Sequence, residues 1–343
     1  MPRGATLAPM PRPNLLVCAG EELFSSFFPK PHVKRLSKIS RWKLNDSRDV
    51  KGLKDELAKA EALVTTWDSP RFSDNLLDLA PRLRMIAHCG GEVKSRFTPG
   101  LFEQLTITNA ADPMARAAAE MGAAFLLYGA RNIDYYRDAL RARSNRIYQD
   151  LHLHGNQEAL AGREVAMIGF GRIGRALVDL LRGFDLQWLV YDPYAAKSAG
   201  KGDAVRFVDL KSLLPRADLL VLTAALTDET RGLLDRKRLS QLPDGALLVN
   251  IARGGIIDLD ALTREVKRGR LRCALDVTDP LEPLPVGHAI RNLPGAMVTP
   301  HIAASNRRVR EQMAEVVMND LENYFAGRPV QNRVTSAMLA RMT

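Results

Sequence analysis

Cysteine is scarce in this chain of 343 residues, which contains three: Cys18, Cys89 and Cys273. They lie far apart, none belongs to a Cys-x-x-Cys pair, and their number is odd. This pattern argues against a disulfide framework and against a zinc site, and it fits a reducing compartment.

Long apolar runs are lacking as well. The chain has no uninterrupted stretch of about 18 apolar residues, which a membrane-spanning helix would need. Residues 1–16 contain four prolines and no apolar segment of signal-peptide length. We therefore expect a cytoplasmic protein without a membrane partner.

The sequence also lacks motifs that would explain its formal net charge of +10 as a nucleic-acid-binding surface. Lys and Arg are scattered along the chain, and no zinc finger, RNP-type motif or basic heptad accompanies them. We interpret the charge as a solvated basic surface that attracts anionic small molecules, and we expect no nucleic-acid partner.

The chain length favours two domains, and residues 1–110 show the first of two alternating strand–helix patterns. Residues 48–63 have apolar positions at helical spacing between two of the apolar runs. Alternation of this kind predicts a mostly parallel sheet. The runs that we interpret as buried strands are 14–20, 62–67, 84–89 and 105–110.

Residues 113–144 are rich in Ala, Leu and Met, which predicts one long helix or two in series. Placed between the two patterns, this segment is expected to connect two domains. Residues 145–162 carry polar groups and glycines and are interpreted as a linker or arm.

The alternation restarts at residue 163, with short continuous apolar strands of the kind that a sheet buried on both faces requires. Helices are predicted at 172–184 and 259–269. Residues 307–329 form an amphipathic helical pattern that ends at Gly327 and Pro329. The predicted strands are 164–169, 187–192, 219–224, 246–251, 271–277 and 296–301.

A glycine pattern, G-x-G-x-x-G, joins the first of these strands to the first helix. Gly169 permits a tight turn, Gly171 lets the backbone approach a pyrophosphate, and Gly174 allows the helix to pack closely on the strand. The N–H groups near Arg172 and Ile173 are expected to bind phosphate oxygens with help from the helix dipole.

Asp192 ends the second strand of this pattern, 18 residues after Gly174. A carboxylate at about this distance accepts hydrogen bonds from the ribose hydroxyls of NAD, and it repels the 2′-phosphate of NADP. NAD (NADH) is therefore the expected cofactor. In the alternative interpretation, Asp192 is a strand-end turn residue before Pro193.

Three later strands each end near one polar side chain, namely Arg253, Glu282 and His301. Ligands of open α/β sheets bind at the carboxyl ends of strands, so these side chains should converge. Arg253 suits a substrate carboxylate and carbonyl, His301 suits proton transfer, and Glu282 would orient the imidazole. Alternatively, the three are a surface arginine, a loop carboxylate and a core histidine.

These residues carry a family resemblance that covers nearly the whole chain. The sequence resembles the D-isomer-specific 2-hydroxyacid dehydrogenases, which include glyoxylate/hydroxypyruvate reductases, D-lactate dehydrogenases and phosphoglycerate dehydrogenases. The shared motifs are GFGRIG (169–174), YDPY (191–194), NIARGGIID (250–258), ALDV (274–277), EPLP (282–285) and TPHIA (299–303).

The resemblance implies an α/β fold of two domains. Residues 163–303 would form a Rossmann-type, doubly wound NAD-binding domain with a parallel sheet. Residues 1–112, completed by 304–343, would form a smaller, discontinuous, flavodoxin-like substrate domain, and 113–162 would be the connecting helix and arm. Members of the family usually pair as homodimers through the cofactor domains and the arm, here near 140–157.

The resemblance also implies roles for individual residues. Arg253, Glu282 and His301 match the catalytic trio. Asp276 matches an acid at the nicotinamide end. The loop 88–94 matches the one that binds the substrate carboxylate through backbone N–H groups. The expected cofactor contacts further include Pro193, Thr223, Ile251 and Ala252, and the expected substrate contacts are Gly91, Glu92, Val93 and Arg253.

Some positions depart from the family pattern. Thr223 and Ala225 replace a His and a Pro that are common after that strand. Because the segment 279–285 is one residue longer than usual, Glu282 is preferred over Asp279 as the partner of His301. Glu92 brings a carboxylate to the substrate loop. It either points away or selects substrates that carry a hydroxyl or an amine.

The sequence thus predicts an NAD-dependent enzyme that interconverts a small 2-oxo acid and its D-2-hydroxy acid by hydride transfer. The alternative is an NAD(H)-binding sensor or co-repressor-like protein of the same fold with little turnover.

Overall fold

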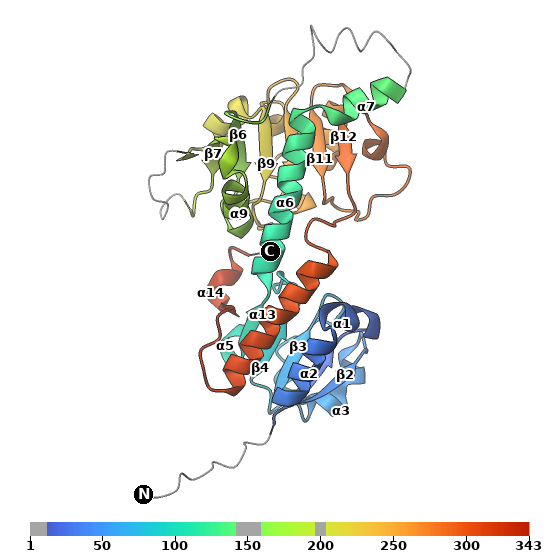
Figure 1. Ribbon diagram of the computed structural model, residues 1–343, viewed down its shortest axis with the longest axis vertical. Helices are drawn as coiled ribbons and strands as arrows, with labels where there is room; N and C mark the ends of the chain where they lie inside the picture. Colours follow the sequence, from blue (N-terminus) through green and yellow to red (C-terminus); the bar gives the residue numbers. More distant parts are fainter. Residues whose placement is uncertain (1–11, 142–158, 196–203, 343) are drawn as a thin grey trace, which may run out of the picture. The chain divides into compact units, whose positions relative to one another are not determined.

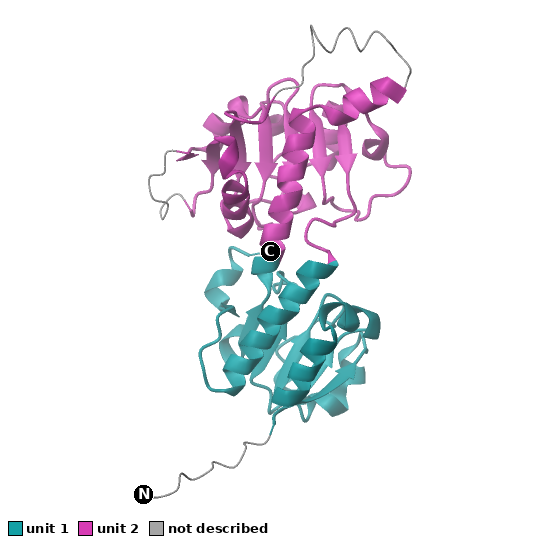
Figure 2. Ribbon diagram, viewed as in Figure 1, with its two compact units in different colours: residues 1–113, 307–343 teal, residues 114–306 magenta. Residues whose placement is uncertain are grey.

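The computed structural model describes residues 12–141, 159–195 and 204–342. The chain divides into two compact units, one formed by Met1–Pro113 together with Arg307–Thr343 and the other by Met114–Asn306 (Figure 2). The predicted linker residues 145–158, and with them most of the predicted dimer arm, lie outside the described residues.

Unit 1 contains a six-stranded sheet whose strands are parallel except at one edge, where β13 runs antiparallel to β5. The order β2-β1-β3-β4-β5 is the flavodoxin-like doubly wound order, as predicted. The strands are β1 (Asn14–Cys18), β2 (Arg41–Asn45), β3 (Ala62–Thr65), β4 (Met85–His88), β5 (Thr106–Asn109) and β13 (Arg333–Val334).

The helices of unit 1 are mostly short. Over 48–63, where the sequence shows helical spacing, a turn of 3-10 helix and a turn of α-helix form before β3 begins at Ala62. The helical elements are α1 (Glu21–Phe27), α2 (Lys30–Ile39), η1 (Val50–Leu53), α3 (Lys54–Leu57), α4 (Leu76–Leu79), α5 (Leu101–Gln104), α13 (Arg307–Phe325) and α14 (Ser336–Leu339).

Helix α13 returns from the end of the chain to complete unit 1, where it lies beside α1 and α2 (Figure 1). Its buried apolar side chains, among them Met313, Val317 and Leu321, face that unit's interior. The helix that the sequence predicts at 307–329 is thus confirmed, and Gly327 follows it with φ +68°.

Unit 2 contains a seven-stranded, fully parallel sheet in the order β12-β11-β10-β9-β6-β7-β8. This arrangement, with β6 followed by β7 and β8 on one side and by β9 to β12 on the other, is the Rossmann order and confirms the predicted fold class. The strands are β6 (Glu164–Ile168), β7 (Gln187–Tyr191), β8 (Val205–Phe207), β9 (Leu219–Leu222), β10 (Leu247–Asn250), β11 (Arg272–Leu275) and β12 (Ala296–Val298).

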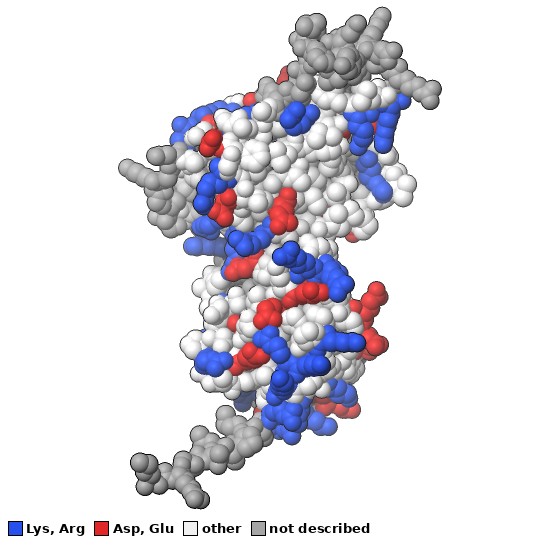
Figure 3. All heavy atoms as spheres, in the orientation of Figure 1, with Lys and Arg blue, Asp and Glu red and all other residues white. Residues whose placement is uncertain are grey.

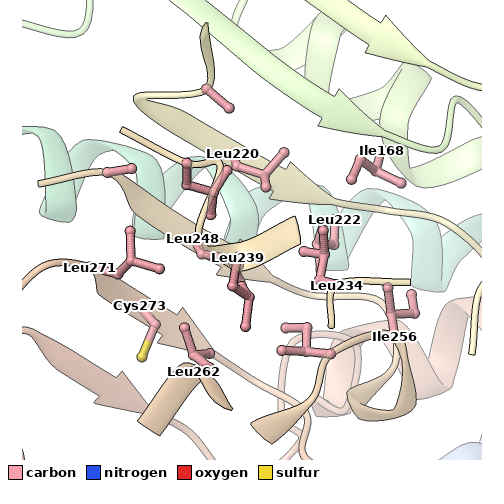
Figure 4. Packing of buried hydrophobic residues seen from close by; sticks show 14 of the residues in the cluster. Ile168, Leu220, Leu222, Leu234, Leu239, Leu248, Ile256, Leu262, Leu271 and Cys273 are labelled. Carbon is pink, nitrogen blue, oxygen red and sulfur yellow. The ribbon is translucent and has the colours of Figure 1, made fainter. Parts of the chain in front are cut away.

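Both faces of this sheet are buried, as its continuous apolar strands predict. Along β9, Leu220 and Leu222 point into one core cluster, shown in Figure 4, whereas Leu219 and Val221 point into the cluster on the opposite face. The helical elements of unit 2 are α6 (Ala111–Ala130), α7 (Ile133–Arg141), α9 (Arg172–Leu180), η2 (Arg182–Phe184), α10 (Leu210–Leu213), η3 (Leu214–Arg216), α11 (Arg236–Leu239), η4 (Gly254–Ile256), α12 (Leu259–Lys267) and η5 (Ala289–Asn292).

The segment 113–144, predicted as one helix or two, forms α6 and α7 in series. From Met114 onward α6 belongs to unit 2 and is more than a connector. Its Phe125 and Leu126 are buried in the second core cluster. Gly129 lies so close to the sheet that a Cβ there would come within 2.2 Å of Leu247 Cδ2.

No helix among the described residues is long and apolar enough to cross a membrane.

Candidate active site

The parallel sheet of unit 2 brings most of the predicted site residues to one edge. The carboxyl ends of parallel strands lie at the same edge of a sheet, where ligands bind in folds of this class. Each of six neighbouring strands contributes one segment. In the order of the sheet these are Asp192 after β7, Gly169 after β6, Thr223 after β9, Arg253 after β10, Asp276 after β11 and His301 after β12.

The turn between β6 and α9 requires glycine at two positions. Gly169 has φ +91°, and a Cβ there would come within 2.4 Å of Ala224 Cα. A Cβ on Gly174 would come within 2.9 Å of the Gly169 carbonyl oxygen. Side chains at these positions would therefore push α9 away from the sheet.

Gly171 meets a different condition. A Cβ placed on it would have no heavy atom within 4 Å, so the space above the turn is open. Gly171 is the N-cap of α9, where no side chain caps the helix. The first N–H groups of a helix have no partner within it, and the N-terminus favours an anion. The open space above Gly171, beside the first N–H groups of α9, fits the pyrophosphate of a dinucleotide.

The Asp192 side chain is hydrogen-bonded to this turn and to the loop that follows β7. Its Oδ2 accepts a hydrogen bond of 2.7 Å from the Phe170 N–H. Its Oδ1 accepts from the N–H groups of Tyr194 and Ala195 at 2.9 and 2.8 Å. The carboxylate thus joins the glycine-rich turn to the loop that begins at Pro193, and its orientation is fixed.

Thr223 supports the same turn from β9. Its Oγ1 donates a hydrogen bond of 2.5 Å to the Gly169 carbonyl oxygen, and its side chain is buried. Thr223, predicted as a cofactor contact, therefore shapes the turn directly.

His301 and Glu282 form a close pair. The distance between His301 Nδ1 and Glu282 Oε2 is 2.7 Å. The other oxygen of Glu282 accepts a hydrogen bond of 3.1 Å from the Thr278 N–H. His301 is also held in the left-handed region, at φ +54°. The carboxylate that pairs with the imidazole is that of Glu282, the preferred candidate over Asp279.

The backbone conformation of His301 is supported by Asp276, which is almost fully buried. One oxygen of Asp276 accepts from Thr299 Oγ1 at 2.5 Å and from the Ile302 N–H at 2.9 Å. The other accepts from the Ala303 N–H at 2.8 Å, and the Asp276 carbonyl accepts from the His301 N–H at 2.8 Å. Asp276 therefore fastens the loop that carries the imidazole.

Arg253 follows β10 on a loop that Asn250 closes. The Asn250 side chain accepts from the Ala252 N–H and donates to the Arg253 carbonyl, both at 3.0 Å. Ile251 and Ala252 are buried between them. The half-buried Arg253 guanidinium donates a hydrogen bond of 2.8 Å to the Ala252 carbonyl.

Comparison with known proteins identifies the family. Residues 123–303 match the model of the D-isomer specific 2-hydroxyacid dehydrogenase, NAD binding domain. The chain belongs to this family. It is 30% identical over 285 residues to a glyoxylate reductase of Pyrococcus furiosus, a match that covers 80% of this chain and 82% of the relative.

The other comparisons agree with the family. A D-3-phosphoglycerate dehydrogenase of Archaeoglobus fulgidus is 29% identical over 281 residues, which cover 81% of this chain and 52% of the relative. The chain thus spans about half the length of that relative. The solved structure of the TT0316 protein from Thermus thermophilus is 30% identical, with a TM-score of 0.75, and the match covers 94% of this chain and all of the other.

In this 2-hydroxyacid dehydrogenase family member, the predicted substrate loop lies in unit 1, after β4. Val93 is fully buried. Glu92 turns back on its own loop, where its carboxylate accepts from the Ser95 N–H at 2.7 Å and from the Ser95 hydroxyl. The Glu92 carboxylate is thus bound by its own loop. The roles of Gly91, Glu92 and Val93 toward a substrate stay predictions.

Sequence reasoning missed two supporting residues of the candidate site, Asn250 and Thr299. Each is a polar residue at the end of an apolar strand. A polar residue at the end of an apolar strand is the pattern that identified Arg253 and His301. The same pattern identifies Asn250 and Thr299.

Proposed function

We propose that this protein is an NAD-dependent oxidoreductase that interconverts a small 2-oxo acid and its D-2-hydroxy acid. The observation that carries the proposal is the 2.7 Å contact between His301 Nδ1 and Glu282 Oε2 at the sheet edge that also bears the glycine-rich turn. Family membership supports it, because the matched segment is the family's NAD-binding domain.

The glycine-rich turn would hold the cofactor, with Asp192 at the ribose. NADH, when bound, supplies the hydride. The remaining requirement is a proton for the substrate oxygen, and His301 is placed to supply it. Because Nδ1–H donates to Glu282, Nε2 is the nitrogen left for the substrate. Protonated His301 donates its Nε2 proton during reduction, and the neutral ring accepts a proton during oxidation.

Arg253 would bind the carboxylate of the substrate and polarise its carbonyl group. Its planar guanidinium is always charged and matches a carboxylate with two parallel N–H donors. The closed Asn250 loop limits the positions that the Arg253 backbone can take. We propose unit 1 as the substrate domain, with the backbone of Gly91–Val93 contributing to substrate binding.

The test is the loss of NADH absorbance with a panel of 2-oxo acids: glyoxylate, hydroxypyruvate, pyruvate, phenylpyruvate and branched-chain forms. We expect turnover with one or two of them. A chain that binds NADH and turns over none would contradict the proposal and favour the sensor-like alternative.

We also propose that the protein is a homodimer. Helix α7 has no buried residue, and it exposes Ile133, Tyr135 and Leu140 at 46, 58 and 64%. Exposed apolar side chains gathered on one helix are typical of an interface. Light scattering should report a dimer, and Leu140→Glu should shift the mass toward the monomer. A wild-type chain that is monomeric at micromolar concentration would refute this proposal.

We further propose a cytoplasmic location and no nucleic-acid partner. The three cysteines are free and buried, which suits a reducing compartment. Lys and Arg lie beside Asp and Glu on the face drawn in Figure 3, which favours attraction of small anions over a dedicated polyanion surface. Cell fractionation and a DNA-binding assay at two salt concentrations would test these points.

A further inference from the structure

A tyrosine links the two loops that flank the glycine-rich turn. Strands β7 and β9 are the two neighbours of β6 in the sheet. Tyr194 follows β7 and Glu229 follows β9. The Tyr194 hydroxyl donates a hydrogen bond to the Glu229 carboxylate, whose oxygens lie 2.8 and 2.7 Å away. The bond therefore joins loops on either side of the β6 turn.

The loop that carries Glu229 is held by its own hydrogen bonds. Thr230 Oγ1 donates to the Ala225 carbonyl at 2.6 Å and accepts from the Thr227 N–H at 2.8 Å. The Arg231 N–H donates to the Thr227 carbonyl at 2.9 Å. Glu229 thus lies on a hydrogen-bonded turn, and its exposed carboxylate accepts from the Tyr194 hydroxyl.

Tyr194 also binds Asp192. Asp192 Oδ1 accepts from the backbone N–H of Tyr194, while Glu229 accepts from the hydroxyl at the far end of the same residue. The two carboxylates are therefore separated by one tyrosine side chain. Tyr194 thus connects Glu229 to Asp192, the residue that would bind ribose.

Arg175 supplies a cation on α9, the helix that follows the glycine-rich turn. The Arg175 guanidinium lies 5.2 Å from the centre of the Phe170 ring, and the Phe170 N–H donates to Asp192. A cation here would attract a phosphate on the ribose. Glu229 adds a second negative charge to that of Asp192, and each negative charge near the ribose opposes the binding of an additional phosphate.

We propose that Glu229, held by Tyr194, is a second residue that determines cofactor specificity and disfavours the 2′-phosphate of NADPH. This inference rests on the proposed function, in which the adenosine ribose lies at Asp192. The charge of Glu229 acts on the phosphate through space, and Tyr194 fixes the position of that charge.

The test compares the dissociation constants of NADH and NADPH, measured by the fluorescence of the bound nucleotide on the full chain without substrate. Glu229→Gln keeps an acceptor for the Tyr194 hydroxyl and removes the charge. We expect NADPH to bind about three- to tenfold more tightly, in line with a screened charge pair, and NADH to change by less than about twofold.

Asp228→Asn is the matched control, since Asp228 is an exposed carboxylate that precedes Glu229 on the same turn. We expect it to leave the ratio of the two constants within about twofold of the wild type. Tyr194→Phe keeps both charges but releases Glu229, and we expect a smaller shift in the direction of Glu229→Gln. Raising the salt concentration should shrink the difference between Glu229→Gln and wild type.

A ratio in Glu229→Gln equal to that in Asp228→Asn overturns the inference and leaves the proposed function intact. A wild-type chain that binds neither nucleotide overturns both. Thermal unfolding of each variant confirms that the chains compared are folded.

Discussion

Gly254 lies directly against the backbone of Thr278, so that a Cβ on Gly254 would come within 2.1 Å of the Thr278 carbonyl carbon. Gly254 follows Arg253, and Thr278 begins the loop that carries Glu282. The absence of a side chain at residue 254 thus sets how closely the loops after β10 and β11 approach each other.

Gly254→Ala should therefore disturb both loops. Because the new methyl group meets backbone atoms, one loop must move, at a cost of about 1–3 kcal/mol. We expect a lower Tm and a loss of turnover greater than the stability change explains. Gly183→Ala is the control, since a Cβ there has no atom within 4 Å. If the two variants behave alike in Tm and rate, the contact is not important.

Asp276→Asn should act through His301. The substitution replaces one oxygen with an amide that cannot accept a hydrogen bond, so the N–H of Ala303 or the donors from Thr299 and Ile302 lose their partner. A buried donor without an acceptor lowers the stability of the folded chain by about 1–3 kcal/mol. We expect kcat to fall at least about tenfold. The family resemblance implies that Asp276 lies at the nicotinamide end of the cofactor. An effect on NADH affinity alone, with kcat unchanged, would support that role instead.

His301→Ala and Glu282→Gln should lower the rate by different amounts. Loss of the imidazole removes the proton donor, and we expect the rate to fall at least about 100-fold. Glu282→Gln keeps a hydrogen-bond acceptor for His301 Nδ1 but replaces a charged acceptor with a neutral one, so a smaller loss is expected. NADH affinity, measured separately, should stay within about twofold in both. A wild-type rate in His301→Ala would remove this residue from the mechanism.

His88 should make unit 1 sensitive to acid. Burial, and to a lesser extent the charge of Arg96, lower its pKa from 6.5 to about 3. Between these values the unfolded chain binds a proton that the folded chain does not, so the free energy of unfolding falls as pH falls. The slope is about 1.4 kcal/mol per pH unit, which gives a loss of about 2 kcal/mol between pH 6.5 and 5.

Urea unfolding at several pH values measures this slope. His88→Asn has no group that titrates in this range, so its stability should decline less steeply than that of wild type below pH 6.5. Its absolute stability is expected to be lower, because the contact between His88 Nδ1 and Thr65 Oγ1 at 2.9 Å is altered. If the stability of both proteins falls with the same slope, His88 is not the source of the acid sensitivity.

The apolar strands of both sheets could be predicted because buried parallel strands leave an unmistakable continuous pattern. Strand β2 was missed for the opposite reason. Its sequence, RWKLN, lies at a sheet edge with every residue at least partly exposed, so it has no apolar run. The helical spacing over 48–63 does not reveal that the helical turns end at Leu57 and that the chain extends again at Ala62.

In the site, too, the sequence predicts some residues and not others. A chemical role can be read from a residue type at a strand end, as for His301. The contacts of Asp276 and Glu229 depend on which loops the sheet order brings together. For Asp276 the partners lie 23 to 27 residues away in the chain, and no local pattern links them.

The return of α13 to unit 1 has a consequence for synthesis. Residues 12–113 emerge from the ribosome first, but α13 and the strand Arg333–Val334, which pairs with β5, emerge last. Until then the apolar surface that Met313, Val317 and Leu321 cover is open, and the edge of β5 is unpaired. Unit 1 therefore cannot complete its fold until residues 307–334 have been made, by which time all of unit 2 has been translated.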